Sequence, residues 1–132
     1  MHYTQSGSLN NTSFNLTATM QPIGPVFDVQ KHNSGTPLEL ELGGTVSATA
    51  LSGSNGISFE LRANGLAPNY KIQGSLKVDH LNDSIFMRSV YTNLRPGIYQ
   101  IQVYAAGAPS GTATGVILDP GGWGEAIIAT EF

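Results

Sequence analysis

The 132-residue sequence has no cysteine, so it can form neither a disulfide nor a thiolate metal site. A chain of this length buries about two thirds of its unfolded surface and needs no such cross-link to hold a core. The absence of cysteine fits a protein that folds in a reducing cytosol, and it disfavours a small, secreted, disulfide-rich module. We therefore expect one self-supporting domain.

Charged residues are also scarce. Asp, Glu, Lys and Arg make up 11% of the chain, whereas about 25% is usual in a soluble domain, and Ser, Thr, Asn, Gln and Gly take their place. The net charge is −3, and the few Lys and Arg are scattered, so the sequence has no basic footprint for nucleic acid. A surface of neutral hydrogen-bonding groups is common in viral coat and fibre proteins and in extracellular β-domains.

Long apolar runs are missing as well. No segment approaches the ~18 apolar residues of a membrane-spanning helix. The chain opens on Met1 and His2 with neither the basic nor the apolar region of a signal peptide. We expect no membrane partner, and a protein that acts outside the cell would leave by another route, such as release of virus particles by lysis.

The dominant pattern is alternation of apolar and polar residues with period two. Across 38–50, apolar side chains occupy most even positions and polar ones most odd positions. Residues 57–62 also alternate, with the apolar side chains at the odd positions. We expect Leu40, Phe59, Ile101 and Val103 to be core. Further strand candidates are 14–20, 26–30, 70–78, 84–91, 98–105, 115–118 and 125–132. About eight or nine strands with turn signals between them predict an all-β antiparallel sandwich or jelly roll.

Residues 1–11 are mostly polar and precede the first strand candidate. We expect them to form a flexible polar arm, which is either disordered or lies across a neighbouring subunit. The remainder, 12–132, shows neither a linker nor an internal repeat. It is expected to be a single β-sandwich domain of the jelly-roll type.

Residues 91–104 (Tyr-Thr-Asn-Leu-Arg-Pro-Gly-Ile-Tyr-Gln-Ile-Gln-Val-Tyr) resemble a recurrent element of jelly-roll domains, in which a strand reaches a Pro-Gly corner and a Tyr-led strand returns. Pro96 fixes φ at that corner, and Gly97 tolerates positive φ. Residues 36–50 look like an early strand of phage virion β-domains. The resemblance is thus to the jelly rolls of capsid decoration or cement proteins and tail-fibre heads, with a weaker likeness to complement- and tumour-necrosis-factor-like heads.

The sequence contains no recognisable catalytic motif. His2, His32 and His80 lie far apart without metal-ligand spacing, and no Gly-x-Ser-x-Gly elbow occurs. We expect no enzyme activity and no cofactor. The cluster of Asp79, Asn82 and Asp83 is open to two interpretations, a calcium site or a loop whose polar side chains cap its own backbone.

Aromatic residues supply the candidate contacts. Trp123, the single tryptophan, lies in the glycine-rich segment 119–124, where it either caps the core or anchors a partner. Tyr104 ends an alternating strand and offers a second ring for stacking. Tyr3 and His2, in the expected arm, complete the set of candidate contact residues.

These features predict a viral structural accessory protein, most directly a capsid decoration or cement protein of a tailed bacteriophage. Such a protein is made in the host cytoplasm and carried on the capsid surface of the virion. Its expected partners are the major capsid protein or another virion protein, and further copies of itself in a dimer or trimer. The alternative is a receptor- or carbohydrate-binding head of a phage fibre or adhesin, in which Trp123 and Tyr104 stack on sugars. A small hydrolase is the third interpretation, because jelly rolls carry all three functions.

Overall fold

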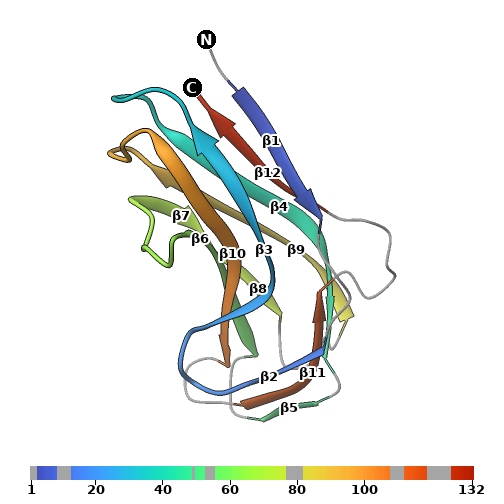
Figure 1. Ribbon diagram of the computed structural model, residues 1–132. Helices are drawn as coiled ribbons and strands as arrows, with labels where there is room; N and C mark the ends of the chain where they lie inside the picture. Colours follow the sequence, from blue (N-terminus) through green and yellow to red (C-terminus); the bar gives the residue numbers. More distant parts are fainter. Residues whose placement is uncertain are drawn as a thin grey trace.

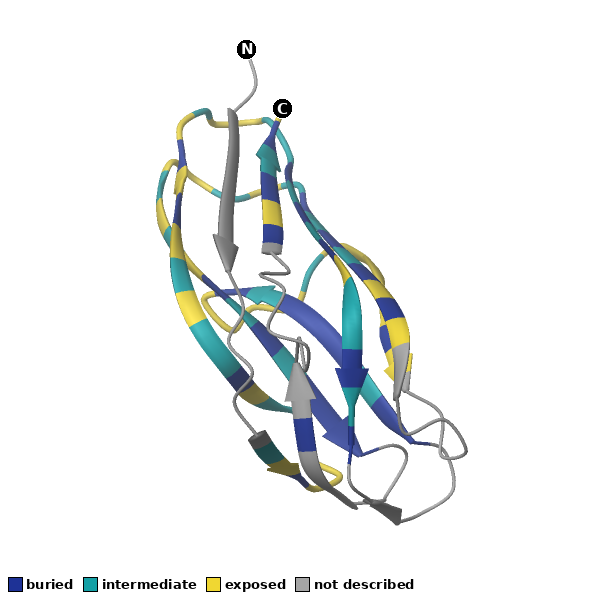
Figure 2. Cartoon of the chain, turned by 90° about the vertical axis from the view of Figure 1, so that its right-hand side faces the viewer, coloured by how far each residue is buried: buried dark blue, intermediate teal, exposed yellow. Residues whose placement is uncertain are grey.

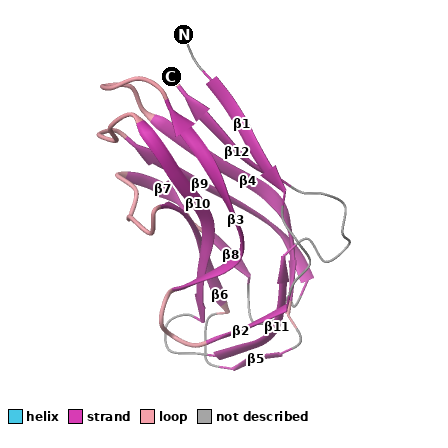
Figure 3. Ribbon diagram, viewed as in Figure 1, coloured by secondary structure: helices cyan, strands magenta, loops and turns pink. Residues whose placement is uncertain are grey.

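The computed structural model describes residues 3–8, 13–48, 50–52, 56–76, 82–107, 112–118 and 126–132. Within these residues every regular element is a β-strand (Figure 3). The strands are β1 (Tyr3–Ser8), β2 (Ser13–Leu16), β3 (Gln21–Lys31), β4 (Leu38–Ser47), β5 (Ala50–Ser52), β6 (Ile57–Ala63), β7 (Tyr70–Ile72), β8 (Gly74–Leu76), β9 (Asn82–Tyr91), β10 (Gly97–Gly107), β11 (Thr112–Leu118) and β12 (Ala126–Glu131). The described part holds no helix with the length and apolar character needed to cross a bilayer.

The strands pair in a nested order, from the ends of the chain toward its middle. β1 pairs with β12, β3 with β10, β4 with β9, and β6 with β8, and every pair is antiparallel. These four pairs fall alternately in one sheet and in the other, as in an antiparallel ribbon that has been rolled up. This arrangement is a jelly roll, and it confirms the all-β antiparallel sandwich expected from the sequence.

The two sheets form separate layers (Figure 1). Sheet A contains β1, β12, β4, β9 and β7, with β2, β11 and β5 at its other end, and sheet B has the order β3-β10-β6-β8. β4 is the central strand of sheet A because it pairs with β9 along one edge and with β12 and β11 in turn along the other. The sheets pack face to face around the core.

The alternating pattern of the sequence becomes the two faces of each sheet. Buried and exposed segments alternate along the strands in Figure 2. Leu40, Phe59 and Ile101 are completely buried and Val103 is 1% exposed, so all four residues predicted to be core are core. At the predicted Pro-Gly corner, Gly97 has φ of 151° and begins β10, a backbone conformation that favours glycine.

A fully buried ion pair joins the end of β3 in sheet B to the end of β12 in sheet A. Lys31 Nζ lies 3.3 Å from Glu131 Oε1, and neither side chain is exposed. The Glu131 carboxylate also accepts the backbone N–H groups of His32 (2.7 Å) and Asn33 (2.5 Å). Lys31 Nζ donates in addition to the Asn33 carbonyl and to Thr36 Oγ1. The pair therefore ties the β3–β4 connection to the last strand.

The hydrogen bonds control the ionisation of Glu131. Burial alone would raise its pKa, but the backbone N–H groups of His32 and Asn33, together with the side chains of His32 and Lys31, outweigh burial and lower the pKa to about 2. Glu131 is therefore ionised in the folded protein across the neutral range.

The expectation of a flexible arm is wrong for residues 3–8. They form β1, which pairs with β12 from Tyr3 opposite Glu131 to Ser8 opposite Ala126. The polar composition of this segment misled the prediction because a strand at a sheet edge is held by backbone hydrogen bonds, which do not require apolar side chains. Residues 1–2 and 9–11 of the expected arm lie outside the described residues.

Candidate binding site on sheet B

The candidate site is built on β10, the strand between β3 and β6 in sheet B. Its odd-numbered residues from Ile101 to Ala105 point into the core, so the pleat turns Gln100, Gln102 and Tyr104 to the outer face. These three side chains therefore form a column along the outside of the sheet.

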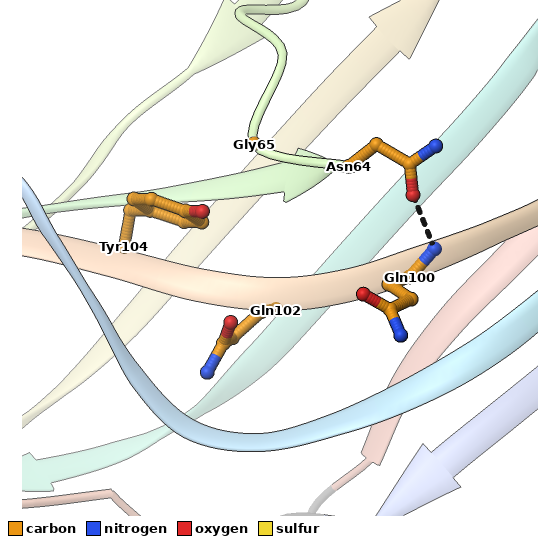
Figure 4. A pocket seen from close by; sticks show the side chains of 5 residues that line it. All are labelled: Asn64, Gly65, Gln100, Gln102 and Tyr104. Atoms are coloured by element: carbon orange, nitrogen blue, oxygen red, sulfur yellow. Dashed lines mark hydrogen bonds between the residues drawn. The ribbon is translucent and has the colours of Figure 1, made fainter.

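A half-open cavity of about 270 Å³ lies over this column (Figure 4). Its lining residues are Asn64, Gly65, Gln100, Gln102 and Tyr104. Ligand sites for drug-sized molecules span about 300–1,000 Å³, so this cavity suits a ligand of roughly one ring.

The wall of the cavity is a tight turn that follows β6. Asn64 (φ 51°) and Gly65 (φ 71°) both have the left-handed conformation that Asn-Gly turns supply. The turn is fixed to β10 in both directions, because the Asn64 N–H donates to the Gln100 carbonyl and Asn64 Oδ1 accepts the Gln100 N–H, each at 2.8 Å. A Cβ atom at Gly65 would lie 3.0 Å from the Tyr104 hydroxyl, so glycine leaves room for that hydroxyl.

Tyr91 supports the same turn from the core side. Its buried hydroxyl accepts the Ala63 N–H at 2.9 Å and donates to the Leu66 carbonyl at 2.5 Å. Burial raises the pKa of Tyr91 to about 12, so the hydroxyl keeps its proton and stays a donor. The residues before and after Asn64 and Gly65 are thus both anchored, and the cavity wall is preorganised.

An ionic cluster borders the cavity on the β6 side. Glu60, which lies opposite Tyr104 in the strand register, is 1% exposed and accepts Arg62 Nε at 2.6 Å and Lys71 Nζ at 2.5 Å. Burial raises the pKa of Glu60, but the hydrogen bonds from Lys71 and Arg62 outweigh it and hold the pKa below its ordinary value. The Arg62 guanidinium also lies over the Tyr104 ring, 4.8 Å from its centroid.

The side chains that line this cavity are three amides and one phenol. Together these groups donate and accept hydrogen bonds beside one aromatic ring. Gln102 Nε2 donates to the Gly24 carbonyl at 2.9 Å, which fixes its amide, and its oxygen lies on the side of Tyr104 in Figure 4. Among the described residues, no three His, Asp or Glu side chains come together as a metal site.

The structure places the predicted contact residues unevenly. Tyr104 is in the cavity, whereas Tyr3 belongs to β1 in the other sheet and its side chain lies outside the described part. Trp123 and His2 lie outside the described residues.

The predicted polar cluster falls largely outside the description as well. Asn82 and Asp83 begin β9, opposite Ser47 and Val46 of β4, and their side chains are outside the described part. Asp79 is not among the described residues, so the choice between a calcium site and a capping loop stays a prediction.

Sequence reasoning missed Asn64, Gln100 and Gln102 as site residues. The sequence does predict part of the site. Asn64-Gly65 is a strong turn motif, and the alternation along β10 places Gln100 and Gln102 on the outer face of the sheet. The sequence did not show that this turn lies against this strand, because that contact depends on the pairing of β6 with β10.

No protein-family model and no curated protein matches the chain. Among solved structures, the chain is similar to murine APRIL crystallised at pH 5.0, with 19% identity, a TM-score of 0.47 and complete coverage of both chains. It is also similar to the carbohydrate-binding module CBM6cm-2 of Cellvibrio mixtus lichenase 5A in complex with cellotriose, with 16% identity, a TM-score of 0.33, and coverage of 88% of this chain and 86% of that one. These TM-scores are too low to identify a site, and the jelly roll is established by its own strand pairing.

Proposed function

We propose that this jelly-roll domain is a non-enzymatic binding module and that the cavity on sheet B holds one ring of a saccharide. The observation that carries the proposal is the position of Tyr104 beside Asn64, Gln100 and Gln102 in a cavity of about 270 Å³. This function corresponds to the receptor- or carbohydrate-binding head that the sequence offered as an alternative.

The residues of the cavity complement both the apolar C–H face and the hydroxyl groups of a sugar. A tyrosine ring packs against the C–H face of a pyranose, and such aromatic contacts contribute about 0.5–1.5 kcal/mol beyond the area they bury. Three amides supply donors and acceptors for the surrounding hydroxyls. The turn and Gln102 are held by their own hydrogen bonds, so little conformational entropy is lost when the ligand binds. The cavity is shallow, and a single ring is expected to bind weakly, with a Kd on the order of 1 mM.

Tyr104→Ala tests this function. We expect the variant to lose about tenfold in affinity for any glycan that the native domain binds, because the ring that packs on the sugar is removed. Tyr104→Phe keeps the ring and should lose less. Glycan-array screening followed by NMR titration of the strongest hits measures the effect.

Tyr70→Ala is the matched control. Tyr70 is 68% exposed but belongs to β7 in sheet A, so its removal should leave glycan affinity unchanged. A native domain that binds no glycan, or one whose affinity survives in Tyr104→Ala and falls in Tyr70→Ala, would contradict the proposed site.

A second candidate function is the capsid decoration or cement role, and the outer face of sheet A favours it. Ile72, Arg88, Glu41 and Ile128 lie in one row across β7, β9, β4 and β12. Ile72 is 50% and Ile128 44% exposed, and Phe86, 46% exposed, lies in the next row over Gly43. Exposed apolar side chains on one face are typical of a surface that contacts another protein.

The charges on this face are already paired. Arg88 Nε lies 2.5 Å from Glu39 Oε1 and 3.7 Å from Glu41 Oε1. Ion pairing within the face lowers the cost of covering it with a partner, and what remains is one excess negative charge, because two carboxylates share one cation. In the capsid role, these apolar residues contact either the major capsid protein or another virion protein, or else a second copy of the domain in a dimer or trimer.

The double variant Ile72→Ser, Phe86→Ser tests this second function. We expect the native domain to form a dimer or trimer, or to sediment with virus particles, and the variant to lose that association because both apolar contacts are removed. Light scattering and co-sedimentation measure it. Ile98→Ser, a change at a 63% exposed residue of sheet B, is the control and should associate normally. A native domain that is strictly monomeric and attaches to no particle would exclude this function.

A further inference from the structure

The β6 side of the sheet B cavity carries more positive than negative charge. Two cations, Arg62 and Lys71, share the single carboxylate of Glu60, so the three side chains sum to one positive charge in a chain whose net charge is −3. The charges also differ in exposure, since Glu60 is 1% exposed while Arg62 is 23% and Lys71 43% exposed. The side chains that a ligand meets are therefore the cations.

Arg62 is the cation closest to the cavity. Its guanidinium lies over the ring of Tyr104, and its NH1 group lies 3.5 Å from the carbonyl of Gly65, so it contacts two of the lining residues. A guanidinium has five N–H donors, and Glu60 engages the Nε–H of Arg62. The outer N–H groups are suited to a carboxylate or sulfate, which accepts two of them at once.

The opposite side of the cavity, at β3, carries a negative charge. Asp28 on β3 is exposed and lies opposite Gln100 in the register of β3 and β10. The field across the cavity thus runs from the excess cation at β6 to the carboxylate at β3. A ligand with one acidic substituent is oriented by this field, with the acid directed toward Arg62 and away from Asp28.

From this arrangement we infer that the ligand is an anionic saccharide, whose ring packs on Tyr104 while an acidic substituent pairs with Arg62 and Lys71. The inference rests on the proposed saccharide-binding function and adds the class of ligand to it. The acidic group is a carboxylate, as in a uronic acid, or a sulfate ester. Both present oxygens to the same donors.

The experiment compares three oligosaccharides of equal length, built from galacturonate, from galactose and from sulfated galactose. NMR titration or calorimetry at low and high salt measures the affinity of the domain for each. We expect the acidic oligosaccharides to bind at least about tenfold more tightly than the neutral one in 50 mM salt, corresponding to about 1.4 kcal/mol. The difference should shrink in 500 mM salt, because a partly exposed ion pair is screened. The better of the two acidic ligands identifies the acidic group.

Two variants locate the charge effect. Arg62→Gln should bring the ratio of acidic to neutral affinity close to one. Lys71→Gln should reduce the same ratio by a smaller factor, because Lys71 is paired with Glu60, whereas Arg62 also contacts Tyr104 and Gly65 of the cavity lining. Thermal melts of both variants show whether the fold is intact, and the ratio of two ligands measured on one variant is insensitive to a loss of folded protein.

The outcomes separate this inference from the function on which it rests. Equal affinity for acidic and neutral oligosaccharides without salt dependence would overturn the anionic class and leave saccharide binding intact. Binding of free sulfate as tight as that of the sulfated sugar would also overturn it, because the ring would then contribute nothing. If none of the three oligosaccharides, nor any array glycan, binds, the proposed function fails as well.

Discussion

Glu131→Gln is expected to lower the free energy of unfolding by about 3–5 kcal/mol. The change keeps the size of the side chain but leaves Lys31 as a buried cation without its counter-ion, which is the costly way to break a buried pair. The backbone N–H groups of His32 and Asn33 also exchange a charged acceptor for a neutral one. Urea denaturation at pH 7, with the native protein as reference, measures the loss.

The pH dependence of this effect has a defined sign. The pKa of Glu131 is lowered from 4.5 to about 2 in the folded protein, so the unfolded chain binds a proton more readily than the folded one. The stabilisation is complete above about pH 5 and is lost as the pH falls toward 2. The stability difference between the native protein and Glu131→Gln should therefore be large at pH 7 and small near pH 2.5. A difference that stays constant between pH 7 and pH 3 would show that the carboxylate charge is not its source.

Leu40→Ala is expected to cost about 2–5 kcal/mol, the range for truncating a buried leucine. Leu40 is completely buried in β4, the central strand of sheet A, so a cavity there is flanked on both sides by paired strands that cannot easily close it. Leu66→Ala is the matched control, because Leu66 is 51% exposed, and it should cost under about 0.5 kcal/mol. If the two variants unfolded at the same midpoint denaturant concentration, this would contradict the burial of Leu40.

The strands of the core could be predicted because their information is local. The alternation across 38–50 and 57–62 gave β4, β6 and the burial of Leu40 and Phe59 correctly. The alternation failed at 70–78, which was expected to be one strand. The structure divides this segment into β7 in sheet A and β8 in sheet B, with Gln73 between them. A crossing from one sheet to the other leaves no trace in a period-two pattern.

The candidate site was less accessible to sequence reasoning because its contacts join distant segments. Tyr104 was predicted as a candidate contact residue, and its neighbours in the cavity depend on Asn64 meeting Gln100 through the register of β6 and β10. The alternation of 57–62 predicts that Glu60 faces solvent, whereas the structure buries it beneath Arg62 and Lys71. Burial of a charged side chain by its ion-pair partners is a tertiary effect that composition and spacing do not report.

The nested strand order has a consequence for how the chain folds. Each pair encloses the pair inside it, so closing β1 on β12 directly means closing a loop of nearly the whole chain. Once β6 and β8 have paired, the loop left for β4 and β9 is shorter, and the same holds for β3 with β10 and finally for β1 with β12. The entropic cost of loop closure thus favours folding from the middle of the chain outward. During synthesis on the ribosome, β1 cannot pair until β12 has been made.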